Sequence, residues 1–179
     1  NELGSSEQET LAAFITGFEV MARLGGGGPA GVGRNLHRRG LHPTSILGRM
    51  GAAVVASVLM RLDARQIEYA LGIAATTAGG LIGSFGTHAK PFHGGKAAMD
   101  GILAAQLAAH GFESATHLLE TEKGLLDAII QDRNVEVPPL DFDARWELLR
   151  NGFKPYASCR ATHASIQAAK KLAPRIAGK

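Results

Sequence analysis

The chain has 179 residues, of which 45% are hydrophobic and 20% charged, with a formal net charge of +3. This length and composition are typical of one globular domain with a real core, and they exclude a disordered chain. The charge excess is mild and no dense basic run with interleaved aromatics is present, so we expect no nucleic-acid partner. An acidic small-molecule substrate is compatible with this balance.

The cysteine content and hydropathy indicate a cytoplasmic protein. The single cysteine, Cys159, can form no internal disulfide, which is consistent with a reducing compartment. The chain opens polar and acidic, without the pattern of a signal peptide. Residues 50–60 are apolar but too short to span a membrane, and residues 70–86 are rich in glycine, threonine and serine. We therefore expect no membrane segment.

The first helix is predicted from Ser6 to about Leu24. Ser6 and Glu9 have capping-box spacing. The apolar residues then recur at helical intervals on one face: Leu11, Phe14, Ile15 and Phe18. Residues 25–33 follow as a glycine-rich loop, which lacks the residue order of a phosphate-binding loop.

Further helices are predicted in chain order. After a short basic segment at residues 34–42, Thr44 or Ser45 is expected to cap a helix that runs to about residue 62. Asp63 and Gln66 have capping spacing for the next helix. The remaining predicted helices are residues 95–110, a short one capped by Ser114, residues 122–130, and a C-terminal one that Thr162 caps and that stops at or soon after Pro174.

These elements predict a mainly α protein, with a tightly packed core of small side chains because alanine and glycine are abundant. The sequence composition changes from residue 131 onward, where a double proline and several acidic residues interrupt the helical periodicity. We therefore divide the chain into a helical domain, residues 1–140, and a second region, residues 141–179. Residues 146–153 are expected to form a short strand or an irregular segment.

The most informative stretch is residues 79–96, which is rich in glycine and lies between two apolar segments. Because Pro91 follows Lys90, we expect that lysine to be extended and the helix to start only afterwards. The predicted loop presents four polar residues: Thr87, His88, Lys90 and His93. Polar groups on an irregular loop held by packed helices are a common way to build a site. The alternative is a helix connection whose cations only face water.

Metal and cofactor signatures are weak. His88 and His93 are five residues apart, which is off the i, i+4 face of a helical zinc pair. Pyridoxal phosphate needs a phosphate cup and a partner for its pyridine nitrogen, and the sequence indicates neither. We therefore predict chemistry without a metal or cofactor.

The remaining candidates are cations and proton carriers on loops. For His42, before Pro43, the local pattern alone favours an exposed turn histidine. Lys90 and Lys154 each precede a proline, and lysines bind carboxylate oxygens as point charges. Histidines move protons near neutral pH. Together these residues suit a substrate with several carboxylates that gains or loses a proton next to one of them.

The spacing of four segments resembles the MmgE/PrpD family. They are G-x-H-x-T-x-x-x-G at residues 40–48, A-x-x-x-x-x-G-L at residues 74–81, T-x-x-K-P-x-H-x-G at residues 87–95, and K-P-Y-x-x-C-x-x-x-H at residues 154–163. The resemblance implies the second half of a large helical domain, followed by the start of a smaller α+β lid. It also implies a homodimer with the active site between the domains, and a chain shorter than full-length members.

Carried over residue by residue, the resemblance implies catalytic roles for His42, Lys90 and Lys154. It leaves substrate binding or loop positioning to a second set: Thr87, His88, His93, Cys159 and His163. Cys159 stands where the decarboxylase branch of the family has a histidine. That departure argues against decarboxylation of cis-aconitate and leaves the dehydratase and isomerase branches open.

Three hypotheses follow from the residues and the resemblance. The first is a cofactor-independent lyase that dehydrates a tricarboxylate such as 2-methylcitrate. The second is an isomerase or epimerase on a related dicarboxylate, which returns the proton to the other face. The third is a truncated, non-catalytic helical module that dimerises through its small-residue faces.

Overall fold

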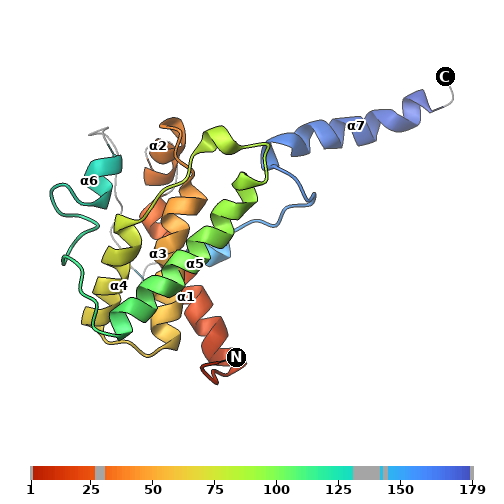
Figure 1. The fold of residues 1–179 in the computed structure, drawn as a ribbon. Coiled ribbons are helices and arrows are strands. Elements are labelled where there is room, and N and C mark those ends of the chain that lie inside the picture. The colour runs from red at the N-terminus through yellow and green to blue at the C-terminus, as the bar shows by residue number, and fades with distance from the viewer. Residues whose placement is uncertain (1, 27–30, 131–141, 143–144, 178–179) are drawn as a thin grey trace. The chain divides into compact units, whose positions relative to one another are not determined.

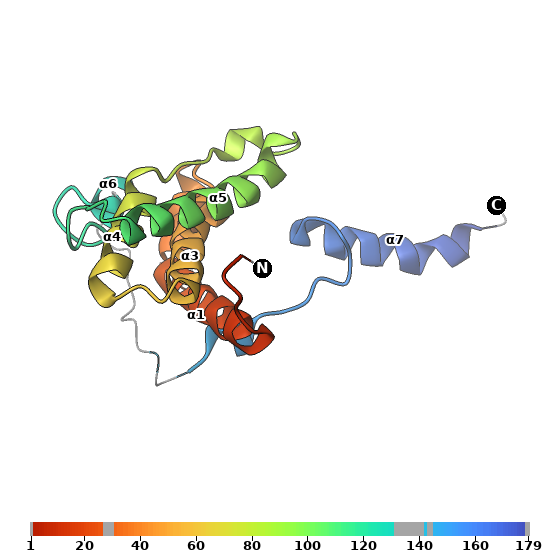
Figure 2. The same cartoon turned by 60° about the horizontal axis from the view of Figure 1, so that its bottom comes forward.

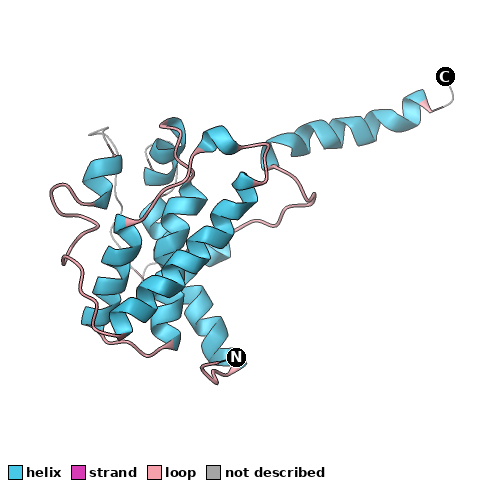
Figure 3. Ribbon diagram, viewed as in Figure 1, coloured by secondary structure: helices cyan, strands magenta, loops and turns pink. Residues whose placement is uncertain are grey.

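A computed structural model describes residues 2–26, 31–130, 142 and 145–177 of the chain. It divides into two compact units, Asn1–Leu148 and Leu149–Lys179. The described residues form helices joined by loops, with no strand among them (Figure 3). The prediction of a mainly α protein is therefore confirmed. The predicted domain boundary after residue 140 falls on residues outside the described ranges and stays a prediction.

The first unit is built around α3. Its helices are α1 (Glu7–Gly25), α2 (Val32–Arg38), α3 (Pro43–Leu59), α4 (Ala64–Thr76), α5 (Ala89–Ala109) and α6 (Leu125–Ile129), with a 3-10 turn η1 (Ile82–Ser84) before α5. Helix α3 packs against α1, α4 and α5, and α5 also packs against α4 (Figures 1 and 2). None of the described helices is long and apolar enough to cross a membrane.

The core consists mostly of small side chains, as predicted. Its fully buried members include Leu36, Ile46 and Met50, together with many alanines of α3, α4 and α5. Helices α3 and α5 approach so closely that a Cβ on Gly101 would lie 2.6 Å from the backbone nitrogen of Ala53. Small residues at these crossings let backbones pack where larger side chains would hold them apart.

The large apolar residues that predicted α1 do not lie on the face of the helix that is buried in the core. The buried residues of α1 are Ala13, Gly17 and Leu24 among others, whereas Phe14 is 52% exposed. Phe14 and Phe18 line an apolar groove of about 540 Å³ with residues of α3 and α5. The spacing correctly predicted the helix, but the bulkiest side chains of the stripe do not enter the core.

Capping signals predicted two helix starts correctly. Ser6 and Glu9 form the expected capping box of α1, and Asp63 and Gln66 form that of α4. Gly111, two residues after the end of α5, has φ +82°, the left-handed conformation that glycine adopts after a helix C-cap. In each case a local hydrogen-bonding or backbone preference defines the helix end.

Other predicted boundaries were wrong. Helix α3 begins at Pro43 with His42 as its N-cap residue, not Thr44 or Ser45, because proline at the first helical position has no amide hydrogen to leave unpaired. Residues 32–38 form α2, where the sequence predicted a loop and a basic segment. The short helix expected after Ser114 is a series of turns, and α6 covers only Leu125–Ile129 of the predicted 122–130.

The second unit contains a short 3-10 turn η3 (Arg160–Thr162) and the helix α7 (His163–Ile176). Thr162 is the N-cap residue of α7 but makes no side-chain capping bond. The helix continues through Pro174 by two residues, in line with the predicted stop. Residues 147–150 form another 3-10 turn, η2 (Glu147–Arg150), with irregular chain after it, which matches the irregular alternative. The predicted α+β lid stays a prediction.

Candidate functional site

The candidate site begins where the α4–α5 loop runs antiparallel to the turn before α3. The amide of His42 donates to the carbonyl of Gly80 at 3.0 Å, and the amide of Ile82 donates to the carbonyl of Gly40 at 2.8 Å. Gly80 has φ +137°, and a Cβ there would lie 2.5 Å from the Oγ of Ser45. Only glycine fits this backbone position without strain. The loop is thereby fixed against the N-terminus of α3.

His42 is buried in the structure, with 8% of its surface exposed. The local pattern favoured an exposed turn histidine, and this interpretation was wrong. Its imidazole packs edge-on against the ring of Phe85, with 4.9 Å between the centroids, and its Nδ1 lies 2.9 Å from the Nδ1 of His93. The residues that cover His42 come from more than forty positions later in the chain, so the neighbouring sequence could not reveal its burial.

The partner His93 is half-buried on α5. Its other ring nitrogen, Nε2, lies 3.5 Å from the Oγ of Ser84, at the edge of hydrogen-bond range. In the His42–His93 contact one Nδ1 donates and the other accepts, so at least one imidazole must be neutral there. The pair is therefore suited to hold a proton between two ring nitrogens.

Electrostatics favour the neutral form of His42. Burial lowers the pKa of His42 below its ordinary value, and the nearby His93, Lys90 and His37 lower it further. A neutral imidazole retains a lone pair that can accept a proton at neutral pH. The position of His42 thus combines a buried base with neighbouring cations.

Lys90 lies on the exposed first turn of α5, with its Nζ 5.8 Å from the centroid of the Phe85 ring. The predicted extended conformation of Lys90 was wrong, because α5 begins at Ala89 and continues through Pro91. Pro91 sits in the first turn, where its missing amide hydrogen costs no intrahelical bond. The helix therefore starts six residues earlier than predicted and carries both Lys90 and His93.

Thr87 and His88 occupy the end of the loop. The hydroxyl of Thr87 donates to the carbonyl of Ser84 at 2.7 Å and accepts from the amide of Ala89 at 3.2 Å. These bonds close the turn that leads into α5. His88 is the exposed N-cap residue of that helix and makes no side-chain capping bond. The geometry of Thr87 is that of a loop-positioning residue.

The other three predicted site residues lie in the second unit. Lys154 and Cys159 are exposed. His163 is half-buried and packs edge-on against Tyr156, with 5.3 Å between the ring centroids, and its Nε2 lies 3.4 Å from the carbonyl oxygen of Ser158. The structure thus brings three of the predicted residues together: His42 contacts His93, and Phe85 lies against the His42 ring and near the Nζ of Lys90. Lys154, Cys159 and His163 belong to the other unit, and their roles stay predictions.

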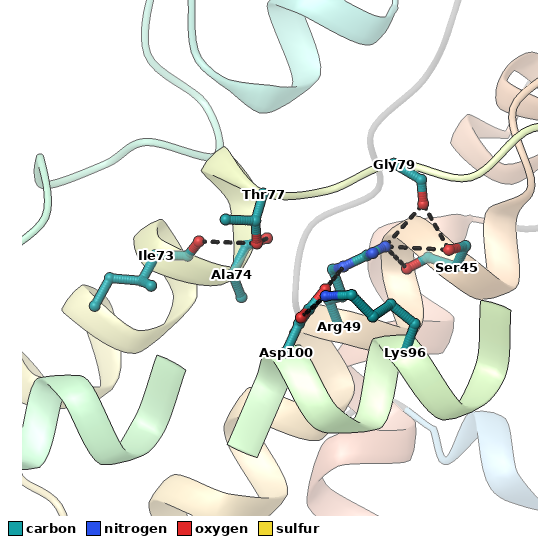
Figure 4. Close-up of polar contacts among 8 residues, drawn as sticks. All are labelled: Ser45, Arg49, Ile73, Ala74, Thr77, Gly79, Lys96 and Asp100. Atoms are coloured by element: carbon teal, nitrogen blue, oxygen red, sulfur yellow. Dashed lines mark hydrogen bonds and ion pairs between the residues drawn. The ribbon is translucent and has the colours of Figure 1, made fainter. Parts of the chain in front are cut away.

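A buried charged network that the sequence motifs did not include joins α3 to α5 (Figure 4). Arg49 Nε donates to Asp100 Oδ2 at 2.7 Å, and Lys96 forms a short ion pair with the other oxygen of Asp100. Burial raises the pKa of Asp100, but hydrogen bonds from Lys96 and Arg49 outweigh it and hold that pKa below the usual range. One signal was present, because Arg49 is the sole charged residue in the sequence of α3.

The first unit is therefore a helical domain in which a pair of histidines lies near a lysine, at the point where α3, α5 and the α4–α5 loop meet. This combination is suited to binding anions and to transferring protons. The family model of the MmgE/PrpD N-terminal domain matches residues 1–138, so the chain belongs to the MmgE/PrpD family. The family predicted from the sequence motifs is confirmed.

Curated relatives include cis-aconitate decarboxylases from fungi and mammals. The Aspergillus terreus protein (strain NIH 2624 / FGSC A1156) is 30% identical over 93% of this chain and 35% of its own length. The Homo sapiens protein is 32% identical over 92% of this chain and 34% of its own length. The Mus musculus protein is 31% identical over 87% of this chain and 31% of its own length. The chain spans about a third of the length of the curated relatives it matches.

Proposed function

We propose that this chain carries part of the active site of a lyase that acts on a di- or tricarboxylate by moving a proton next to a carboxylate, without a cofactor. The observation that carries the proposal is the buried His42, paired with His93 and flanked by Lys90. Relatives named as cis-aconitate decarboxylases support a lyase on a tricarboxylate.

Each of the three residues has a role in the proposal. His42 is the base that accepts the proton, because burial and nearby cations favour its neutral form. The proton arrives at Nε2 of His42, and His93 stabilises the protonated ring by accepting the Nδ1–H of His42 at its own Nδ1. Lys90, which is exposed at the start of α5, binds a substrate carboxylate and stabilises the enolate-like charge that develops as the proton leaves.

The specific reaction proposed is dehydration of a tricarboxylate such as 2-methylcitrate. The C–H bond next to a carboxylate breaks, its electron pair becomes part of the new C=C bond, and the C–O bond to the hydroxyl breaks. Hydroxide leaves and takes up a proton as water. As the resemblance implies, the proposal also gives Lys154 a catalytic role and His88, Cys159 and His163 substrate contacts, while Thr87 positions the loop. We propose that the protein works as a cytoplasmic homodimer.

A second candidate is decarboxylation of cis-aconitate, which the names of the relatives favour. The exposed Cys159, at the position where the sequence resemblance implies a histidine in decarboxylases, favours dehydration. The reactions differ in their products: dehydration gives water and an alkene, and decarboxylation gives carbon dioxide. An epimerase gives neither product and inverts a stereocentre.

Thermal melting with polycarboxylates tests the proposal. Citrate, 2-methylcitrate and cis-aconitate are titrated against the chain, and we expect a saturable rise in melting temperature with at least one of them. Lys90→Ala and His42→Asn should abolish the rise. Lys171→Ala, which removes the same charge from exposed α7, should keep it. If no carboxylate shifts the melting curve, the proposal is refuted for this chain.

Turnover then separates the reactions. The chain is incubated with each carboxylate, and proton NMR follows alkene formation while released carbon dioxide is trapped. Alkene formation from 2-methylcitrate that Lys90→Ala abolishes supports the dehydratase. Release of carbon dioxide from cis-aconitate would instead support decarboxylation, the second candidate, and refute the dehydratase.

A further inference from the structure

Arg49 connects all three segments that build the candidate site. Its side chain is buried on α3, and its Nε donates to Asp100 on α5 at 2.7 Å. Its Nη1 donates to the carbonyl of Ser45 at 2.6 Å and to the carbonyl of Gly79, in the α4–α5 loop, at 2.8 Å. One guanidinium therefore holds the start of α3, the middle of α5 and the loop between α4 and α5 (Figure 4).

The ion pair lies in register with the imidazole pair on both helices. Arg49 follows His42, the N-cap residue of α3, by seven residues, and Asp100 follows His93 by seven residues on α5. Seven residues are two helical turns, a rise of about 10 Å, so each pair of residues shares one helix face. Helices α3 and α5 are thus cross-linked twice, once by the two imidazoles and once by the ion pair.

The loop contact continues directly to His42. The carbonyl of Gly79 accepts from Arg49 and, at 2.5 Å, from the hydroxyl of Ser45. The next carbonyl, that of Gly80, accepts from the amide of His42. The loop then carries Phe85 over the His42 ring. The position of the Gly79 carbonyl therefore determines how the loop covers His42.

We propose that Arg49 and Asp100 are positioning residues that set the spacing of the His42–His93 pair and its cover by the loop. The importance of that pair for chemistry rests on the proposed function, whereas the mechanical link does not. Arginine is required at this position because its planar fork donates in several fixed directions at once, and a lysine ammonium cannot reproduce that geometry.

The test is NMR of the whole chain with ¹⁵N-labelled histidine side chains, without any carboxylate ligand. The readouts are the ring-nitrogen shifts of His42 and its titration midpoint. In Arg49→Lys and Asp100→Asn we expect the midpoint to rise toward the ordinary value of 6.5, because the imidazole becomes more hydrated. The shift pattern of the His42–His93 hydrogen bond should disappear.

A matched control separates positioning from general stability. Arg23 forms a buried ion pair with Glu19 on α1, and Glu19 also accepts from the backbone amides of residues 147 and 148. Arg23→Lys should lower the melting temperature and leave the His42 midpoint unchanged. Ser45→Ala removes one donor to the Gly79 carbonyl and keeps the ion pair, so a smaller rise is expected.

The outcomes decide the proposal. It is overturned if Arg49→Lys and Asp100→Asn leave the His42 signals unchanged, or if Arg23→Lys moves them equally. If Arg49→Lys does not fold, Ser45→Ala becomes the deciding variant, and an unchanged His42 midpoint in it overturns the proposal. Failure of carboxylate binding would refute the proposed function and leave this NMR result untouched.

Discussion

Gly101→Ala tests how closely α3 and α5 pack beneath the site. A Cβ on Gly101 would lie 2.5 Å from the Cβ of Ala52, 2.6 Å from the nitrogen of Ala53 and 2.7 Å from the carbonyl carbon of Ala52. Two of these atoms belong to the backbone of α3, so a change of rotamer cannot relieve the overlap. The helices must move apart.

The change in stability on Gly101→Ala is the sum of two opposing contributions, helix propensity and overpacking. Alanine favours a helix over glycine by about 1 kcal/mol. Overpacking a well-packed core costs typically about 1–3 kcal/mol, and a clash with backbone belongs at the upper end. We therefore expect Gly101→Ala to lower the free energy of unfolding by about 2 kcal/mol, which corresponds to a fall in melting temperature of roughly 4–8 °C.

Urea unfolding followed by far-UV circular dichroism measures this difference, with Gly94→Ala as the control. Gly94 lies on the same helix, and a Cβ there would meet no atom within 4 Å. This variant should gain about 0.5–1 kcal/mol from helix propensity alone. If Gly101→Ala is as stable as Gly94→Ala, the inferred close packing of α3 and α5 is wrong.

Three further predictions concern the core, a cap and pH. Leu36→Ala, at a fully buried position, should cost about 2–5 kcal/mol in urea unfolding, and a loss under 1 kcal/mol would contradict its place in the core. Ser6→Ala removes the bond to the Glu9 amide and should cost about 1 kcal/mol, with thermal melting as the measurement. Because folding lowers the pKa of His42, the unfolded chain takes up a proton at a higher pH than the folded chain does. The contribution of His42 to stability is therefore fully present above about pH 6.5 and is lost as the pH falls through the folded-state pKa. His42→Asn should flatten that part of the pH profile, and an unchanged profile would refute the assignment.

Local signals in the sequence predicted those features that neighbouring residues determine. The capping boxes at Ser6 and Asp63 placed two helix starts, because both partners of each bond lie three residues apart. The start of α5 was missed because the preference of a residue before proline was given too much weight at Lys90. Tertiary packing of α5 against α3 and α4 overrides that local preference.

Features that depend on distant segments could not be predicted in the same way. The motifs identified His42 and His93 as candidates, but their contact joins positions 51 residues apart, and nothing in either segment specifies the other. The burial of His42 depends equally on Phe85, which arrives with the loop. Candidate residues were therefore accessible from the sequence, while their arrangement required the packing of α3, α5 and the loop.

The buried Arg49–Asp100 pair has a further consequence for how the site is maintained. Replacing a buried ion pair by well-packed apolar residues is often neutral or stabilising, so overall stability alone does not account for this pair. An apolar pair could pack α3 against α5, but it would supply no donor to the Gly79 carbonyl. That carbonyl would then lose its arginine donor and keep only the bond from Ser45. The charged pair therefore does what apolar packing cannot, because it holds the loop that covers His42 as well as the two helices.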